Sequence, residues 1–301
     1  MLWLLVAEIR KLARPLVWGT ALAIVAFCLL ITWGAANNAR AALASPRIPD
    51  VCAQAATAQC NQVIAHAHAA ARAAATTTSQ LAQPGEIGHV AAGMLASVPG
   101  LLLIAMIAGG HWGGEWGSRT IRQLLSRESR RGRVLAAKWL SIWAAGVATL
   151  LVCYLVLAVA APVIAATAGL PAAHSALWAG LGSSVWAAGR AIVVLGVFAA
   201  VGTAAGTIGR GQLATTAVTA GSMLLALLVA GIAGIGQLSP ATFVQAWMGF
   251  GPAGYLPTNF WSRFIGGEDH FSQLAGLLGI LLTAAVAAAI ARWRFAADVT
   301  A

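Results

Sequence analysis

The sequence predicts an all-α, polytopic membrane protein with six transmembrane helices, because it is strongly apolar, nearly uncharged and built from long apolar runs. Of its 301 residues, 60% are hydrophobic and 9% are charged, whereas a soluble domain carries about 25% charged residues. Lipid accepts apolar surface of this extent. The apolar runs are continuous and about 20 residues long, the length of a helix that crosses a ~30 Å hydrocarbon core. The strands of a membrane barrel are shorter and alternate between polar and apolar residues.

The N-terminal segment, residues 1–15, is predicted to be an amphipathic helix in the membrane interface. Its apolar residues recur at helical spacing on one face: Leu2, Leu5, Val6, Ile9 and Leu12. Its basic residues fall on another face: Arg10, Lys11 and Arg14. The alternative is a signal peptide cleaved after Gly34–Ala36, which would leave five spans. The apolar run that follows, residues 16–36, is long enough to cross the bilayer, which favours a first span instead.

Five further spans follow, separated by segments of different character. They are predicted at residues 93–113, 139–161, 187–207, 213–236 and 273–291. Residues 37–92 form a polar, alanine-rich loop, expected to make one or two helices outside the membrane. Residues 237–272 are apolar but interrupted by prolines and glycines, which predicts a broken, re-entrant segment before the last span.

The basic residues predict the orientation. Of the 18 Lys and Arg residues, thirteen fall on one side: Arg10, Lys11, Arg14, the seven from Arg119 to Lys138, Arg210, Arg292 and Arg294. The other side carries Arg40, Arg47, Arg72 and Arg263. The positive-inside rule therefore places both termini in the cytoplasm, and the net charge of +10 indicates topology rather than a nucleic-acid partner.

The four cysteines divide into two pairs. Cys28 and Cys153 lie within apolar runs and are expected to be inert core thiols. Cys52 and Cys60 lie in the external loop, where disulfides persist. Eight residues along one straight helix would separate them by ~12 Å, beyond the ~7 Å limit for a disulfide. We expect a disulfide across a turn; two free thiols are the alternative.

Several kinds of active site have no counterpart in the sequence. There is no phosphate-binding P-loop, no His-Glu-x-x-His zinc motif and no Gly-x-Ser-x-Gly nucleophile motif. His111 and Glu115 share a helical face and are interpreted as an interfacial pair, since two ligands do not make a metal site. The spans hold no Asp or Glu, which proton-coupled carriers generally need. Arg190 is expected to snorkel to the outer interface; a substrate contact is the alternative.

The cytoplasmic segment 114–138 is rich in arginine and carries an apolar edge. Ile121, Leu124 and Leu125 recur at helical spacing between Arg119, Arg122 and Arg127. A short cationic helix held between two spans is suited to docking on a cytosolic protein. The alternative is a basic loop that only fixes topology.

This segment resembles the loop after the second span in type-2 permeases of ATP-binding-cassette (ABC) exporters. That family shows a Glu, a Gly-Thr pair, Leu-Leu, a Ser-Arg pair and a Lys that opens the third span. The matching residues are Glu115, Thr120, Leu124, Leu125, Ser129, Arg130 and Lys138. Arg119 stands at the family's Gly position and Glu128 where Pro is common. The N-terminal helix (which resembles the family's elbow helix), the six spans, the large first external loop and the broken segment extend the resemblance over nearly the whole chain.

The resemblance implies a transport subunit, not an enzyme, in a bacterial plasma membrane. Two permease chains, identical or paralogous, would bind separate cytosolic ATPase subunits, which carry the ATP and Mg²⁺; this chain would bind no cofactor itself. The coupling residues would be Glu115, Arg119, Thr120, Arg122, Leu124, Leu125, Ser129, Arg130, Arg131 and Lys138. The substrate would be an amphipathic or hydrophobic molecule exported from the cell.

Two alternatives remain at this point: a membrane-embedded enzyme acting on lipid or isoprenoid substrates, and a channel or immunity protein independent of any ATPase. Gly202-x-x-x-Gly206 and the cluster Gly109, Gly110, Gly113 and Gly114 permit close helix approach. These glycines mark either a dimer face or ordinary packing within one chain.

Overall fold

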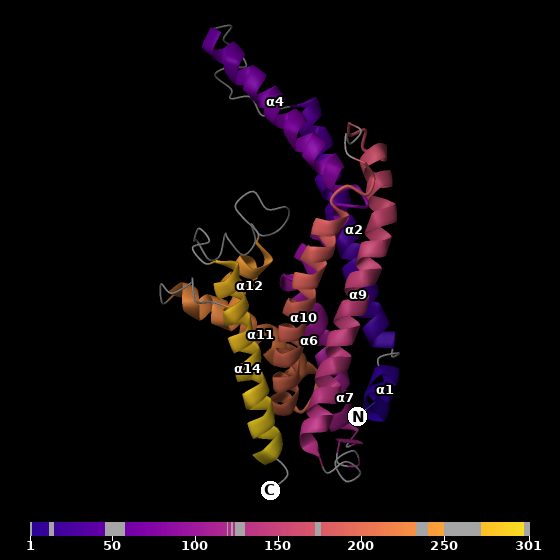
Figure 1. Ribbon diagram of the computed structural model, residues 1–301, viewed down its shortest axis with the longest axis vertical. Helices are drawn as coiled ribbons and strands as arrows, with labels where there is room; N and C mark the ends of the chain where they lie inside the picture. Colours follow the sequence, from indigo (N-terminus) through magenta and orange to yellow (C-terminus); the bar gives the residue numbers. More distant parts are fainter. Residues whose placement is uncertain are drawn as a thin grey trace. The chain divides into compact units, whose positions relative to one another are not determined.

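The computed structural model describes residues 2–11, 15–45, 58–118, 120, 121, 123, 130–171, 176–232, 240–249 and 272–297. These residues form helices joined by turns, with no strand among them, so the all-α class is confirmed for this part of the chain (Figure 1). The predicted Cys52–Cys60 disulfide involves a residue outside the described ranges. It stays a prediction.

Four helices are long and apolar enough to cross a membrane: α2 (Pro15–Ala44), α9 (Arg131–Thr167), α10 (Leu181–Gly209) and α14 (Gln273–Ala297). A fifth span is obtained if Ile87–Leu95 and Val98–Gly117, which are bent by 55°, count as one broken span. Four or five candidate spans are therefore found among the described residues, where the sequence predicts six. The remaining predicted span, 213–236, coincides with α11 (Gln212–Ile232) and continues past the described residues.

The predicted second span is the one that is broken. Helix α5 (Ile87–Leu95) ends, Ser97 adopts an extended conformation (φ −122°, ψ −161°), and α6 (Val98–Ala108) then begins with Pro99 in its first turn. Proline is suited to that position because it has no backbone N–H to leave unpaired there. A π-helix, η1 (Gly109–Gly113), and the short α7 (Gly114–Gly117) follow without interruption.

The shorter helices lie where the sequence predicts elements outside the regular spans. Helix α1 (Leu2–Lys11) falls within the predicted elbow, and α4 (Ala58–Leu81) within the predicted external loop. Helix α12 (Pro240–Met248) falls within the predicted broken segment.

The chain forms two compact units. The first comprises Met1–Ile24, Ala92–Leu151 and Ala187–Ala301; the second comprises Val25–Ala91 and Val152–Trp186. Within the second unit, Cys28 and Cys153 are both buried as free thiols, which agrees with the interpretation as core residues. The Ser184 hydroxyl donates to Gly85 O (2.6 Å) and the Tyr154 hydroxyl to Pro84 O (3.2 Å), fixing the turn before α5.

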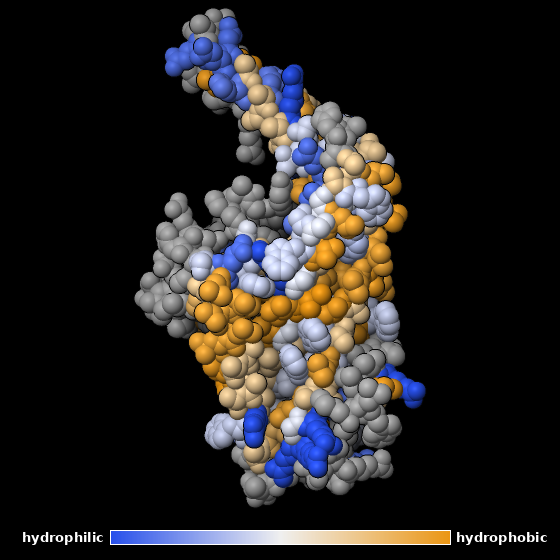
Figure 2. All heavy atoms as spheres, viewed as in Figure 1, coloured by the Kyte–Doolittle hydropathy of each residue, from blue (hydrophilic) through white to orange (hydrophobic). Residues whose placement is uncertain are grey.

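Exposed apolar stripes run along two of the long helices. On α14 they are Leu274, Leu278, Leu282 and Val286, and on α9 Leu151, Leu155, Val159 and Val163. Each set recurs every four residues, so it forms one continuous face. Figure 2 shows apolar side chains over the middle of α14 and hydrophilic ones toward its C-terminal end. Monomeric soluble proteins rarely expose patches of this kind, whereas lipid accepts them.

Candidate functional site

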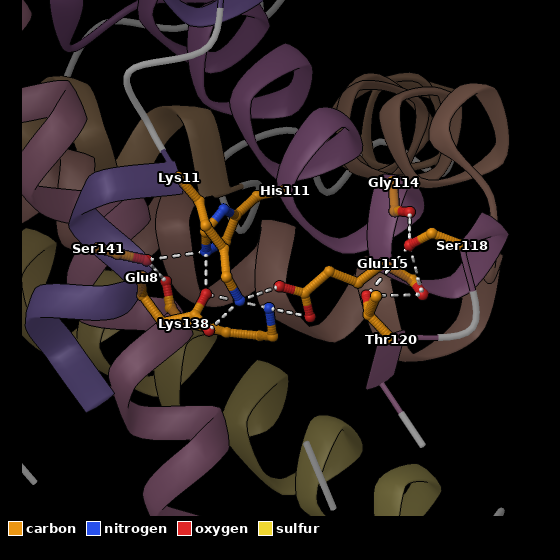
Figure 3. A network of polar contacts seen from close by, with 9 residues as sticks. All are labelled: Glu8, Lys11, His111, Gly114, Glu115, Ser118, Thr120, Lys138 and Ser141. Carbon is orange, nitrogen blue, oxygen red and sulfur yellow. Dashed lines mark hydrogen bonds and ion pairs between the residues drawn. The ribbon is translucent and has the colours of Figure 1, made fainter. Parts of the chain in front are cut away.

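Five ionisable side chains meet inside the first unit, in what we call the ion cluster (Figure 3). They are Glu8 and Lys11 from α1, His111 from η1, Glu115 from α7 and Lys138 from α9. Glu8, Glu115 and Lys138 are 1%, 3% and 0% exposed as side chains, and only Lys11 reaches solvent, at 32%. The cluster therefore joins the N-terminal helix to the end of the second predicted span and the start of α9.

Each carboxylate oxygen of the cluster faces a cation or the imidazole. Lys11 Nζ lies 2.7 Å from Glu8 Oε1 and 2.6 Å from Glu115 Oε1. Lys138 Nζ lies 2.7 Å from Glu115 Oε2 and 3.2 Å from Glu8 Oε2. His111 Nε2 lies 2.7 Å from Glu8 Oε2. The two lysines thus bridge the two glutamates in a closed ring. Glu115 Oε2 is held by its ion pair with Lys138 and accepts no hydrogen bond.

The contacts around His111 fit a hydrogen on its Nε2 atom. Its Nε2 lies 3.1 Å from Ser141 Oγ, and the Ser141 hydroxyl donates to the carbonyl of Lys138 at 2.8 Å. Because that hydroxyl proton is used there and an ionised Glu8 only accepts, the tautomer with its hydrogen on Nε2 fits both contacts. With this neutral imidazole, two carboxylates and two ammonium groups sum to zero charge. Burial of this much charge is tolerable only with such complete pairing.

The local sequence explains how these groups converge. Glu8 and Lys11 are three residues apart on α1, so they share a face. The π-turn of η1 widens the helix just before Glu115, and glycines let α11 approach it. A Cβ atom at Gly113 would overlap the backbone of Gln212, and one at Gly109 would overlap the Thr216 side chain. Glycine is therefore required at both positions for this packing.

The environment shifts the pKa of both α1 side chains. Burial opposes ionisation of Glu8, but the hydrogen bond from His111, the charge of Lys138 and the hydrogen bond from Lys11 outweigh it and hold the pKa of Glu8 well below its usual range. Burial also disfavours the charged form of Lys11. The carboxylates of Glu115 and Glu8 outweigh this effect and raise the pKa of Lys11 above its ordinary 10.5.

The structure brings together two of the sequence-predicted coupling residues. Glu115 and Lys138, at opposite ends of the 114–138 segment, form the 2.7 Å ion pair and are both buried, so neither is presented to a partner here. The Thr120 hydroxyl lies 3.0 Å from the Ser118 hydroxyl. Arg131 lies apart from the cluster and donates to the carbonyl of Ala296 at 3.2 Å. Arg130 is exposed, and the remaining coupling residues lie outside the described ranges: Arg119, Arg122, Leu124, Leu125 and Ser129.

The sequence analysis paired His111 with Glu115, whereas in the structure His111 lies against Glu8 and Glu115 against Lys11 and Lys138; Glu8 and Lys11 were missed. A signal was present. Glu8 is the one acidic residue before Asp50, and Glu115 is the one acidic residue between Glu86 and Glu128. Acidic residues are rare beside membrane helices and usually pair with a charged residue. Glu8 and Glu115 could therefore have been expected to pair with the same lysines.

No protein-family model, curated protein or solved structure matches this chain. Among the described residues no group of three or more His, Cys, Asp or Glu side chains is arranged to hold a metal ion.

The glycines considered as marks of a dimer face pack against other helices of the same chain. A Cβ atom at Gly206 would overlap the ring of Trp112, and one at Gly202 would lie 2.8 Å from the Ala108 Cβ. Together with Gly109 and Gly113, these residues bring α10 and α11 against α6 and η1. The ordinary-packing alternative therefore accounts for these four positions.

Arg190 serves as a tie between helices. Its guanidinium donates to the carbonyl of Met248 at 3.0 Å and to Gln273 Oε1 at 2.9 Å, and it lies 5.5 Å from the Trp247 ring centroid. The indole of Trp247 in turn donates to the carbonyl of Arg190 at 3.2 Å. These bonds join α10, α12 and α14; snorkelling of Arg190 to the outer interface stays a prediction.

Proposed function

We propose that this chain is the membrane-spanning permease subunit of an ABC exporter, driven by ATP that a separate cytosolic ATPase hydrolyses. The observation that carries the proposal is the buried Glu115–Lys138 ion pair, which joins the two ends of the arginine-rich segment. Both residues belong to the pattern that resembles the family's coupling loop. Six spans, cytoplasmic termini and a plasma-membrane location are part of the same proposal.

The ion cluster supports a mechanical role for this segment. The Glu115–Lys138 ion pair joins the two ends of the segment that contains residues 116–137. Lys11 and Glu8 connect this pair to α1. A force applied to the segment would therefore act on three elements at once: α1, the α6–η1–α7 span and α9. Such ties would transmit a displacement, because leaving a buried charge without its partner costs about 3–5 kcal/mol.

A noncatalytic role for this chain is part of the same proposal. A membrane-embedded lipid or isoprenoid enzyme would need an available acid or base at one interface, and His111 and Glu115 were the candidates. Both are engaged: His111 with Glu8 at 2.7 Å, and Glu115 with two lysines at 2.6 and 2.7 Å. A channel or immunity protein would differ in being active without any partner.

Direct contact with the ATPase is assigned to the residues between the two ends of the segment. Glu115 and Lys138 hold the two ends of the segment together, while Arg122, Leu124 and Arg130 would contact the ATPase. Arginine suits the rim of such an interface and leucine its core. As the family resemblance implies, the exported molecules would be amphipathic or hydrophobic.

Co-purification tests the proposal. Charge reversal at Arg122 or Arg130, or truncation of Leu124 and Leu125 to Ala, should abolish recovery of the ATPase while membrane insertion is preserved. Arg72→Glu is the matched control, because Arg72 is an exposed arginine on α4, in the predicted external loop. Undiminished ATPase recovery with the Arg122 and Leu124 variants would refute the assignment.

A further inference from the structure

An open apolar groove of about 790 Å³ lies between α9, α10 and α14 of the first unit. Its walls are mainly alanine, including Ala284 and Ala288 of α14, with Leu135 and Trp139 of α9 opposite them. The Trp139 indole N–H is bonded to the carbonyl of Gly196 at 2.9 Å, which fixes that wall. A volume of this size lies within the ~300–1,000 Å³ range of ligand sites in proteins.

Two arginines line the same groove at one end. Arg131 lies at the start of α9 and Arg292 near the end of α14, and no acidic residue is among the described lining residues. Figure 2 shows hydrophilic side chains gathered toward this end of α14. The groove is therefore apolar along its length and cationic at its mouth. An occupant that complements it has an anionic head and a hydrocarbon tail.

The length of the groove fits one leaflet of a bilayer. Its α14 wall runs from Ala284 to Ala296, about 18 Å at 1.5 Å per residue. Half of a ~30 Å hydrocarbon core is about 15 Å. Arg131 lies at the start of α9 and Arg292 near the end of α14, and both helices are long and apolar enough to span. Lipid phosphates are found at the ends of such helices. Guanidinium groups bind phosphate oxygens with two parallel hydrogen bonds, so arginine is suited to this position.

We infer that this groove binds an anionic glycerophospholipid, with its phosphate between Arg131 and Arg292 and an acyl chain along the alanine wall. A helix from a second copy of the chain fits less well. The predicted spans contain no Asp or Glu, so none of them would bring a counter-charge to the two arginines. The inference requires a membrane location but not an ATPase partner, so it stands or falls separately from the proposed function.

Lipid binding to the purified full-length chain tests the inference. Affinity is measured in detergent for phosphatidylglycerol and for phosphatidylcholine with the same acyl chains, with the elution volume recorded for each variant. Replacing both groove arginines (Arg131→Gln, Arg292→Gln) should lower phosphatidylglycerol affinity about 25-fold, at about fivefold per cation. Phosphatidylcholine binding should be unchanged. A second pair outside the lining, Arg133→Gln with Arg294→Gln, controls for general loss of positive charge.

Filling the groove gives an independent test. Ala288→Trp should abolish binding of both lipids at this site, whereas Ala289→Trp, at an exposed neighbouring position outside the lining, should leave binding unchanged. Equal losses in both arginine pairs would overturn the inference, because the effect would then be nonspecific electrostatics. Unaltered phosphatidylglycerol binding by Ala288→Trp would also overturn it. So would a change of oligomeric state in that variant without a change in lipid binding, which would assign the groove to a second copy.

Discussion

Removal of the Lys138 ammonium group is the perturbation that best tests the ion cluster. Lys138 is fully buried and lies 2.7 Å from Glu115 Oε2 and 3.2 Å from Glu8 Oε2. Lys138→Met keeps the apolar length of the side chain and deletes its charge. Two buried carboxylates are then left with Lys11 as the one cation of the cluster, and the cluster carries a net charge of −1.

The expected loss is large because the remaining charge is buried and uncompensated. Breaking a buried pair by removing one partner costs about 3–5 kcal/mol. Glu115→Gln should cost a similar amount with the opposite residual charge. The double variant, Glu115→Gln with Lys138→Met, restores neutrality and should lose less than the two single variants together. The expected coupling energy is about 2 kcal/mol, within the usual range for residues in direct contact.

Equilibrium unfolding of the purified chain in mixed detergent micelles measures these four species in one thermodynamic cycle. Arg133→Met, a cation on the same helix outside the cluster, is the matched control and should lie within about 0.5 kcal/mol of the unmodified chain. A loss below about 1 kcal/mol for Lys138→Met would refute the reasoning, since removing one partner of a buried pair should cost several times more. Strict additivity in the double variant would refute it as well.

Two further predictions concern stability. Gly206→Ala should destabilise the chain by about 1–3 kcal/mol in the same unfolding assay, because the new methyl group overlaps a buried indole ring. Gly189→Ala, on the same helix with nothing within 4 Å of the added atom, should stabilise the chain by about 0.4–1 kcal/mol; equal effects at both positions would contradict the packing. The pKa of Glu8 is held below its ordinary 4.5, so ionised Glu8 stabilises the fold above that pH, and this contribution is lost as pH falls through the lower folded-state pKa. The melting temperature should therefore fall with acidification below about pH 4.5, with a shallower fall in Glu8→Gln; identical profiles would contradict the burial of a charged Glu8.

The long helices could be predicted from the sequence because their apolar runs are continuous. The break in the predicted second span could not, although Pro99 was visible. Proline is tolerated inside membrane helices, and the residues on both sides of it are equally apolar, so periodicity does not mark the bend. The π-turn at Gly109–Gly113 is likewise invisible, because the sequence carries no periodic signal for one widened turn.

The candidate site was predictable in part. Glu115 and Lys138 were recognised as members of one pattern, but a pattern along the chain does not say whether its residues face a partner or each other. Their pairing depends on η1 and α9 meeting α1, a tertiary contact that brings Glu8 within 3.2 Å of a residue 130 positions later. The same holds for Gly202 and Gly206. Small residues permit a second helix to pack closely, but the sequence does not indicate which helix that is.

Purification of the chain with its endogenous partners tests the central claim most directly. The proposed function predicts that a protein containing a P-loop co-elutes with the chain in a fixed ratio and is lost when Arg122 and Leu124 are replaced. Vesicles that contain the purified chain alone should then move no solute. Vigorous solute movement in those vesicles, or labelling that maps residues 119–129 to the cell exterior, would contradict it.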